Sequence, residues 1–290
     1  MMTELTDTLI VCVLAFIMLS IGMSLTIKAF KEILAKPSAL ILALFLQMIL
    51  IPLLSFALIH LFDLPPTWKV GFMILAICPG GPTASFINHL FKANVALSIA
   101  LTSINSLLTL ISIPLITNYS LQYFMGTSTQ FHLPFWNTFQ EIFVITLIPA
   151  TAGILIRIWQ EEFADRWQNR LKSISAGLLG LVFLIKIFAG EKQGGTSLTM
   201  MDTLQLLPSS LILNALGLIF GYYCFRLFRF NKKDALSVST ELAIHNTTLA
   251  FLITATFLRN AEMTKPALIY SLFSFWTAFG FAWLVTREKT

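Results

Sequence analysis

The sequence predicts an all-α polytopic membrane protein with nine transmembrane helices. Of its 290 residues, 57% are hydrophobic and only 11% are charged, and the mean hydropathy is +0.81. Because soluble domains are about one-quarter charged, this composition excludes a sizeable soluble domain. The apolar residues form nine segments, each about long enough to cross a bilayer. These segments are 8–27, 38–62, 68–91, 95–117, 139–159, 171–189, 204–227, 236–257 and 266–285.

The lysine and arginine residues support this count. Fourteen of the nineteen lie in the C-terminal tail and in the gaps after the first, third, fifth and seventh segments, whereas four lie in the other gaps. Cytoplasmic connections carry an excess of Lys and Arg. The bias therefore predicts nine crossings, with the N-terminus outside and the C-terminus in the cytoplasm. It also explains the net charge of +5 without a nucleic-acid partner.

The first two segments differ in the polar side chains around them. Segment 8–27 follows Glu4 and Asp7 with no preceding base, so we expect a retained first helix rather than a secretory signal. Segment 38–62 carries Gln47 ahead of a proline. Because a Gln facing lipid is costly, Gln47 is expected to face the protein interior, either at a binding site or in an interhelical hydrogen bond.

The third segment, 68–91, is interrupted by the run Cys78-Pro-Gly-Gly-Pro-Thr-Ala-Ser85. Proline removes a backbone donor and glycine loosens the chain. Two of each within four positions predict a broken helix rather than a simple kink. We expect the first piece to end at Ile77 and the second to begin near Phe86. Non-helical backbone at this depth is tolerated only where protein or a cavity covers it.

The fourth segment, 95–117, carries a polar stripe. Ser98, Thr102 and Asn105 recur at helical spacing and therefore share one face. Such a stripe either joins helices or lines a site, and its position directly after the break favours a site. The residues from 119 to 140 are rich in aromatic side chains and contain no Lys or Arg, so we expect an outer loop there.

The eighth segment, 236–257, holds the only acidic residue deep inside an apolar segment, Glu241. A carboxylate at this depth is normally paired, protonated or bound to a cation. Around it lie His245, Asn246 and Thr247. This cluster predicts a second broken helix, whose free carbonyls and amides can bind ions. We expect Glu241 to bind a coupling ion; the alternative is a carboxylate satisfied by its helix neighbours.

The order of these segments indicates an internal repeat. A helix with polar residues, a broken helix and an unbroken helix occur in segments two to four and again in segments seven to nine. The two copies run in opposite directions, which is typical of inverted repeats with a midplane site between two crossing discontinuous helices. We treat residues 1–290 as a single transmembrane transporter unit.

Four motifs, in collinear order, resemble the bile acid:sodium symporter family. They are Cys78–Ser85, Asn94–Ser103, Glu241–Thr247 and Leu272–Trp276. The resemblance covers nearly the whole chain and implies the nine-helix form found in bacterial inner (plasma) membranes. It implies sodium-coupled symport of a small organic anion by alternating access. It also implies a core domain from 38–117 and 204–285 and a panel domain from 6–27 and 139–189.

The resemblance also implies the site residues. The coupling-ion site would comprise Glu241, Gln47, Ser85, Ser98, Thr102, Leu242, Ile244 and His245, with Leu242 and Ile244 acting through their carbonyls. The substrate site would comprise Thr83, Asn105, Asn246 and Thr247. Hard oxygen ligands suit a small alkali cation such as sodium. The dispersed histidines and cysteines predict no metal centre beyond sodium.

Three departures from the family pattern bear on coupling and substrate. Ala84 and Ser85 stand where the family has Ser-Asn, and Thr277-Ala278 stands where it has His-Asn. His245 stands where the family has Gln. Imidazole is a poor sodium ligand but a good proton carrier near neutral pH. Proton coupling through Glu241 and His245 therefore stays open, as does a spacer role for His245, and we expect a substrate other than bile acids.

Three other functions compete with this prediction. A cation/proton exchanger built on the same broken helices would exchange ions without an organic substrate. An intramembrane enzyme would use Glu241 and His245 as acid and base, but the sequence offers no nucleophile or second metal ligand. A receptor without transport is disfavoured by the paired breaks. The sequence predicts a transporter and not an enzyme, and it leaves the substrate and the oligomeric state open.

Overall fold

The computed structural model describes residues 2–24, 37–126, 132–188 and 195–287. Within these ranges the protein is helical, which confirms the all-α prediction. Among the described residues, six helices are long and apolar enough to cross a membrane: 7–24, 37–60, 95–125, 135–159, 200–227 and 261–287. Shorter apolar helices cover 66–77, 177–188 and 247–257. The chain therefore has the helices of an integral membrane protein.

Within each described range, few irregular residues separate consecutive elements. In order they are α1 (Met2–Ser24), α3 (Pro37–Phe45), η1 (Leu46–Leu50), α4 (Ile51–His60), α5 (Pro66–Ile77), α6 (Pro82–Leu90), α7 (Val95–Met125), α8 (Phe135–Ile142), η2 (Phe143–Leu147), α9 (Ile148–Trp159), α10 (Glu161–Phe188), α11 (Met200–Leu227), α12 (Lys232–Ala243), α13 (Thr247–Phe251), η4 (Leu252–Phe257) and α14 (Ala261–Arg287).

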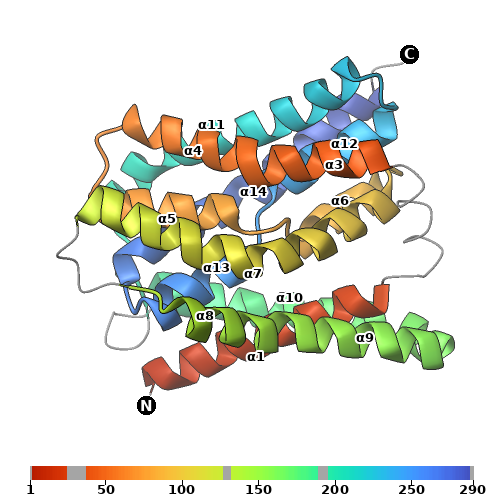
Figure 1. The fold of residues 1–290 in the computed structure, drawn as a ribbon, viewed down its shortest axis with the longest axis horizontal. Coiled ribbons are helices and arrows are strands. Elements are labelled where there is room, and N and C mark those ends of the chain that lie inside the picture. Colours follow the sequence, from red (N-terminus) through yellow and green to blue (C-terminus); the bar gives the residue numbers. More distant parts are fainter. Residues whose placement is uncertain (1, 25–36, 127–131, 189–194, 288–290) are drawn as a thin grey trace.

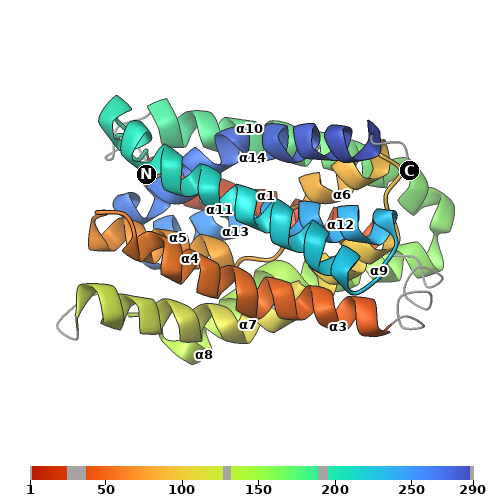
Figure 2. The ribbon, with the colours of Figure 1, turned by 90° about the horizontal axis from the view of Figure 1, so that it is seen from above.

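The helices form two groups (Figure 1). Helices α1, α8, α9 and α10 lie together along the lower side of the view, and α1 packs mainly against α9 and α10. The remaining helices form the larger group above them, in which α11 packs on α12 and both α7 and α14 pack on α5. Seen from above, α11 runs across the connection between α12 and α13 (Figure 2). Both broken helices thus lie inside the larger group.

Helices α1 and α9 approach closely through glycine. A Cβ added to Gly22 would overlap the carbonyl of Ala150, and one added to Gly153 would overlap the carbonyl of Leu19. Small residues permit such close backbone packing between membrane helices. The buried Arg157 extends the contact, since its Nε donates to the Met23 carbonyl at 2.7 Å. The smaller group is therefore tightly joined.

Two helices widen into a π-helical turn just before a proline. The turn Leu46–Leu50 precedes Pro52, and the turn Phe143–Leu147 precedes Pro149. Because proline lacks the N–H that a regular helix requires, a wider turn accommodates the missing bond. The first of these turns carries Gln47, whose side chain is buried, as the sequence predicts.

Several predicted boundaries are wrong. The second piece of the third segment begins at Pro82 and not near Phe86, because proline fits the first helical position, where no donor is needed. Helix α7 continues to Met125 and α8 begins at Phe135, so most of the predicted loop 119–140 is helical. Hydropathy marks only the lipid-facing length of a helix, and it misses polar turns that extend beyond it.

The predicted start of α10 is wrong as well, since the helix begins at Glu161 rather than near residue 171. Its first turns are charged, so hydropathy predicts a connecting loop where the chain is already helical. Part of the basic stretch after the first segment falls on residues 25–36, which lie outside the described residues.

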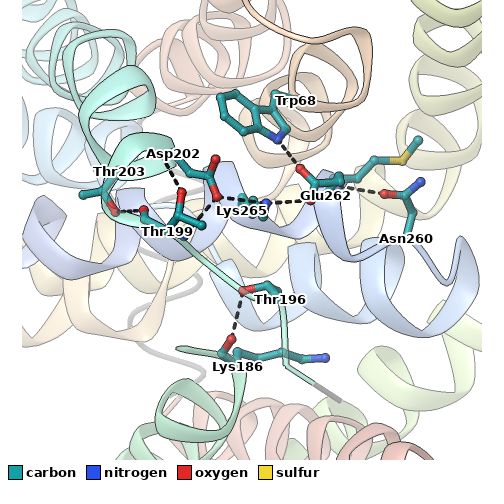
Figure 3. A network of polar contacts seen from close by, with 10 residues as sticks. Trp68, Lys186, Thr196, Thr199, Asp202, Thr203, Asn260, Glu262 and Lys265 are labelled. Carbon is teal, nitrogen blue, oxygen red and sulfur yellow. Dashed lines mark hydrogen bonds and ion pairs between the residues drawn. The ribbon is translucent and has the colours of Figure 1, made fainter. Parts of the chain in front are cut away.

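A charged network ties one end of the larger group together (Figure 3). Lys265 on α14 is buried, and its Nζ donates to Asp202 Oδ2 on α11 at 2.9 Å. It also pairs with Glu262, whose other carboxylate oxygen accepts from Trp68 Nε1 on α5 at 2.7 Å. Asp202 in turn completes a capping box with Thr199 at the start of α11. One ammonium group thereby holds three helices at this end.

We expect Lys265→Met to destabilise the protein. The substitution leaves Asp202 and Glu262 without their shared cation, and losing one partner of a buried ion pair costs several kcal/mol. Because Glu262 is partly exposed, we expect a smaller loss, seen as a fall of roughly 5–10 °C in apparent melting temperature. Thermal unfolding of the purified protein measures it. Lys69→Met is the control, since no ion pair among the described residues joins Lys69 to either carboxylate; equal falls would contradict the prediction.

Candidate functional site

The two helix interruptions lie against each other at the middle of the bundle (Figure 1). The backbone N–H of Gly81 donates to the Ile244 carbonyl at 2.7 Å, and the N–H of Asn246 donates to the Pro79 carbonyl at 2.8 Å. Gly80 and His245 are thereby paired in antiparallel fashion. Each broken helix supplies partners for backbone groups that the other leaves free.

Glu241 lies three residues before Ile244, the first residue of this pairing, and is completely buried. Its Oε1 accepts a hydrogen bond from Ser98 Oγ, and its Oε2 accepts one from Thr102 Oγ1 at 2.7 Å. Because the Ser98 hydroxyl hydrogen is used in this way, Ser85 Oγ is the donor in its 2.9 Å contact with Ser98 Oγ. Residues from α6, α7 and α12 therefore meet at one carboxylate.

The Glu241 carboxylate has no counter-charge in the part of the chain that the structure describes. None of the ion pairs there joins it to a Lys, Arg or His side chain. An ionised carboxylate buried without a cation is strongly unfavourable. The polar groups that contact it are the hydroxyls of Ser98 and Thr102, and hard cations prefer oxygen ligands of this kind.

Gly80 allows the two breaks to approach each other. A Cβ built on Gly80 would overlap Glu241 Oε2 and stand 2.9 Å from its Cδ. A Cβ on Gly81 would stand 3.1 Å from the His245 carbonyl oxygen. This distance is shorter than an ordinary van der Waals contact, but the overlap is smaller than at Gly80. Glycine is needed at position 80 because the carboxylate occupies the space of a side chain.

A second group of polar atoms surrounds the Cys78 carbonyl at the end of α5. Gln47 Nε2 donates to this carbonyl at 3.4 Å, and His245 Nδ1 lies 3.4 Å from it. Among the described residues, Gln47 Oε1 and His245 Nε2 are buried without a hydrogen-bond partner. Buried polar atoms normally have partners, so these two atoms mark a place that can accept a ligand.

The carbonyls of Leu242 and Ile244 are both displaced from regular helix bonding. Asn246 N–H, which would bond to the Leu242 carbonyl in a continuous helix, donates to Pro79 instead. The Leu242 oxygen lies beside α11, where a Cβ on Gly217 would be 2.7 Å from it. The Ile244 oxygen already accepts from Gly81 and has one further lone pair.

Glu241 and His245 are not on one helical face, because α12 ends at Ala243, between them. Glu241 contacts α7, whereas His245 contacts the Cys78 carbonyl and the ring of Tyr270. No hydrogen bond or ion pair of the described residues joins the two side chains. The geometry gives no direct proton path between them.

The predicted substrate residues have different surroundings. Asn246 Oδ1 caps α13 by accepting from Leu249 N–H at 3.0 Å, while its buried Nδ2 has no partner among the described residues. Both amide atoms of Asn105 are also buried and unpartnered in that part of the chain. Thr83 is exposed in the first turn of α6, and Thr247 is buried in the first turn of α13.

The sequence did not single out Asn214 or Tyr270, which bind the backbone of the second break. The Ala243 carbonyl accepts from Tyr270 Oη at 2.7 Å and from Asn214 Nδ2 at 2.8 Å. Thr277 Oγ1 donates to Asn214 Oδ1 at 2.6 Å, so it serves this network. The polar character of Asn214 inside an apolar segment was the only signal in the sequence.

Comparison with known proteins gives a consistent result. Residues 11–196 match the Sodium Bile acid symporter family. A Bacillus subtilis protein named "Uncharacterized sodium-dependent transporter YocS" is 26% identical over 262 residues, covering 89% of this chain and 77% of that protein. The human "Hepatic sodium/bile acid cotransporter" is 24% identical over 246 residues, covering 84% of this chain and 68% of that protein.

A chloroplastic protein of Arabidopsis thaliana, "Probable sodium/metabolite cotransporter BASS1", is 24% identical over 260 residues. The match covers 89% of this chain but only 62% of the plant protein.

Proposed function

The chain belongs to the Sodium Bile acid symporter family, whose match covers well over half of it, and on this premise we propose that it is a sodium-coupled importer of a small organic anion. Membership places the chain among transporters rather than enzymes. One observation carries the proposal further: Glu241 is buried, has no counter-charge among the described residues, and accepts hydrogen bonds from hydroxyls of α7. A cation bound there would remove the electrostatic cost of the carboxylate.

Two ion positions fit the donor set. The first would use Glu241 with the hydroxyls of Ser98, Thr102 and Ser85. The second would use Gln47 Oε1 and the carbonyls of Leu242 and Ile244, with His245 beside them. The unpartnered Gln47 Oε1 supports this second position, since it is an oxygen acceptor without a donor among the described residues. All of these ligands except His245 are oxygen, which suits sodium.

The helix arrangement supports nine crossings. In this reading α1, α3–α4, α5–α6, α7, α8–α9, α10, α11, α12–η4 and α14 each cross once. The two broken helices then belong to inverted repeats, with α3–α7 and α11–α14 forming the core domain. The smaller group of helices forms the panel domain. The basic connections support an orientation with the N-terminus outside and the C-terminus in the cytoplasm.

The half-helices support an anionic substrate. The N-termini of α6 and α13 begin at the paired breaks, and helix N-termini favour anionic groups. Thr83, Asn105, Asn246 and Thr247 would supply donors there. Thr277 and Ala278 stand where the family resemblance implies His-Asn, and the Thr277 hydroxyl donates to Asn214 Oδ1 within the protein. This difference supports an anion other than bile acids.

Alternating access would then arise from movement of the core against the panel. In this structure α1 contacts α13 and η4, and Thr256 Oγ1 donates to Asp7 Oδ1 at 3.2 Å. Moving the second broken helix away from α1 would require this hydrogen bond to break. Sodium binding would drive the change only if it favours one state over the other.

The proposal is tested by measuring thermal stability in NaCl and in choline chloride at several pH values. A ligand that binds the folded state stabilises it by mass action. We expect NaCl to raise the melting temperature of the wild type at every pH. If NaCl has no effect relative to choline, the sodium-coupled proposal fails. A pH-dependent stabilisation lost in both Glu241→Gln and His245→Gln would indicate protons instead.

We expect Ser98→Ala and Thr102→Val to weaken sodium binding without abolishing it. Each removes one hydroxyl ligand, so the sodium concentration for half-maximal stabilisation should rise roughly three- to tenfold. Ser103→Ala is the matched control, because the Ser103 hydroxyl bonds only to its own helix at the Ile99 carbonyl among the described residues. A shift in the control as large as in Ser98→Ala would argue against a ligand role.

A further inference from the structure

We infer that Tyr270 and Asn214 are positioning residues that fix the backbone carbonyls at the second break and thereby set the affinity for sodium. The inference rests on the proposed function, since it assumes that sodium binds at this break. Neither side chain is itself a proposed ligand. Both act through the carbonyl of Ala243, the last residue of α12.

The Ala243 carbonyl has lost its helical partner. In a continuous helix it would accept from the N–H of Thr247, but that N–H donates to the His245 carbonyl at 3.0 Å. Tyr270 Oη and Asn214 Nδ2 replace it, at 2.7 and 2.8 Å. A buried carbonyl without any partner would cost more than one hydrogen bond normally contributes. The two side chains therefore make this particular break possible.

The hydrogen bonds among Asn214, Tyr270 and the Ala243 carbonyl form a ring that restricts the orientation of both side chains. Asn214 Nδ2 has two hydrogens, and it donates one to Ala243 and the other to Tyr270 Oη at 3.2 Å. Thr277 donates to Asn214 Oδ1, which fixes the orientation of the amide. Tyr270 and Asn214 are 0% and 1% exposed, so water does not compete for these bonds. The three residues come from α11 and α14, outside the broken helix.

The network acts on the neighbouring carbonyls because it holds one side of a short extended segment. Ile244 is extended, with φ −114° and ψ 97°, and its carbonyl accepts from Gly81 of the other broken helix. Ala243 is held toward α11 and α14. The peptide group before Ala243 carries the Leu242 oxygen, and the peptide group after Ile244 carries the Ile244 oxygen, so the Ala243 and Ile244 hydrogen bonds restrain both. Preorganised ligands bind with less loss of conformational freedom.

The experiment uses the purified full-length protein, with NaCl titrated against choline chloride at constant ionic strength and unfolding temperature as the readout. Tyr270→Phe should raise the sodium concentration for half-maximal stabilisation roughly three- to tenfold. Tyr223→Phe is the matched control, because that ring lies on α11 with 62% exposure, and it should keep the wild-type midpoint. Thr277→Val should also raise the midpoint, whereas Thr277→Ser, which keeps the hydroxyl, should restore it.

The outcomes separate the possibilities. If Tyr270→Phe and Thr277→Val lower the melting temperature in choline but keep the wild-type sodium midpoint, the network is only structural and the inference is wrong. If Tyr270→Phe does not fold, the contrast between Thr277→Val and Thr277→Ser decides the matter in the same way. If the wild type itself does not respond to sodium, the proposed function fails, and this inference fails with it.

Discussion

Glu241→Gln is expected to abolish stabilisation by sodium while leaving the protein at least as stable as the wild type in choline. Glutamine has the same shape but no charge, so a cation loses its main electrostatic partner. At a sodium concentration one hundred times the dissociation constant, the lost stabilisation is about 2.7 kcal/mol. In choline, the substitution removes a buried charge that has no counter-charge among the described residues, so we expect an equal or higher melting temperature.

The prediction is specific because Glu241→Gln should lower the melting temperature relative to the wild type in NaCl and should keep or raise it in choline chloride. Glu141→Gln on α8 is the control, because it makes the same chemical change at an exposed side chain. We expect its sodium response to match that of the wild type. A Glu241→Gln protein that still gains stability from sodium would remove Glu241 from the ion site. A variant that unfolds in choline would instead indicate that the carboxylate serves mainly to hold α7 against α12.

Gly80→Ala is expected to eliminate sodium binding and to destabilise the protein as well. The new methyl group would occupy the position of Glu241 Oε2, so either the carboxylate moves or the paired breaks separate. Inserting atoms into a filled interior costs about 1–3 kcal/mol. The measurement is the sodium titration of melting temperature, supported by the melting temperature in choline.

Two further glycines calibrate this result. Gly180→Ala on α10 should have little effect, because a Cβ there meets no atom within 4 Å. Gly81→Ala should give an intermediate loss, since its Cβ would stand 3.1 Å from the His245 carbonyl. Adding Glu241→Asp to Gly80→Ala shortens the carboxylate side chain and should recover part of the stability. Absence of that recovery would show that the methyl group disturbs the backbone pairing rather than the carboxylate.

The sequence predicted the parts of the site that depend on local chemistry. Proline and glycine at 79–82 and the polar cluster after Glu241 indicate two interrupted helices, and the structure has both. The spacing of Ser98 and Thr102 places them on one helical face, and both contact Glu241. In these cases neighbouring residues determine the geometry, so a single sequence contains the signal.

Other features depend on which helices pack together, and the sequence does not contain that information directly. Asn214 and Tyr270 meet the Ala243 carbonyl although they are separated from it by 29 and 27 positions. The sequence left proton coupling through Glu241 and His245 open, and only the structure shows that α12 ends between these two residues. The helix ends at Met125 and Glu161 were missed because charged and aromatic residues continue a helix beyond its apolar part.

The antiparallel pairing of the two breaks has a thermodynamic consequence. Because Gly81 and Asn246 bond each break to the other, the proposed ion ligands and both half-helix N-termini are mechanically connected. Two ligands that bind such connected sites change each other's affinity by the same factor. If sodium strengthens binding of the organic anion tenfold, the anion must strengthen sodium binding tenfold. A substitution that loosens the pairing should reduce both factors together, even where each ligand still binds alone.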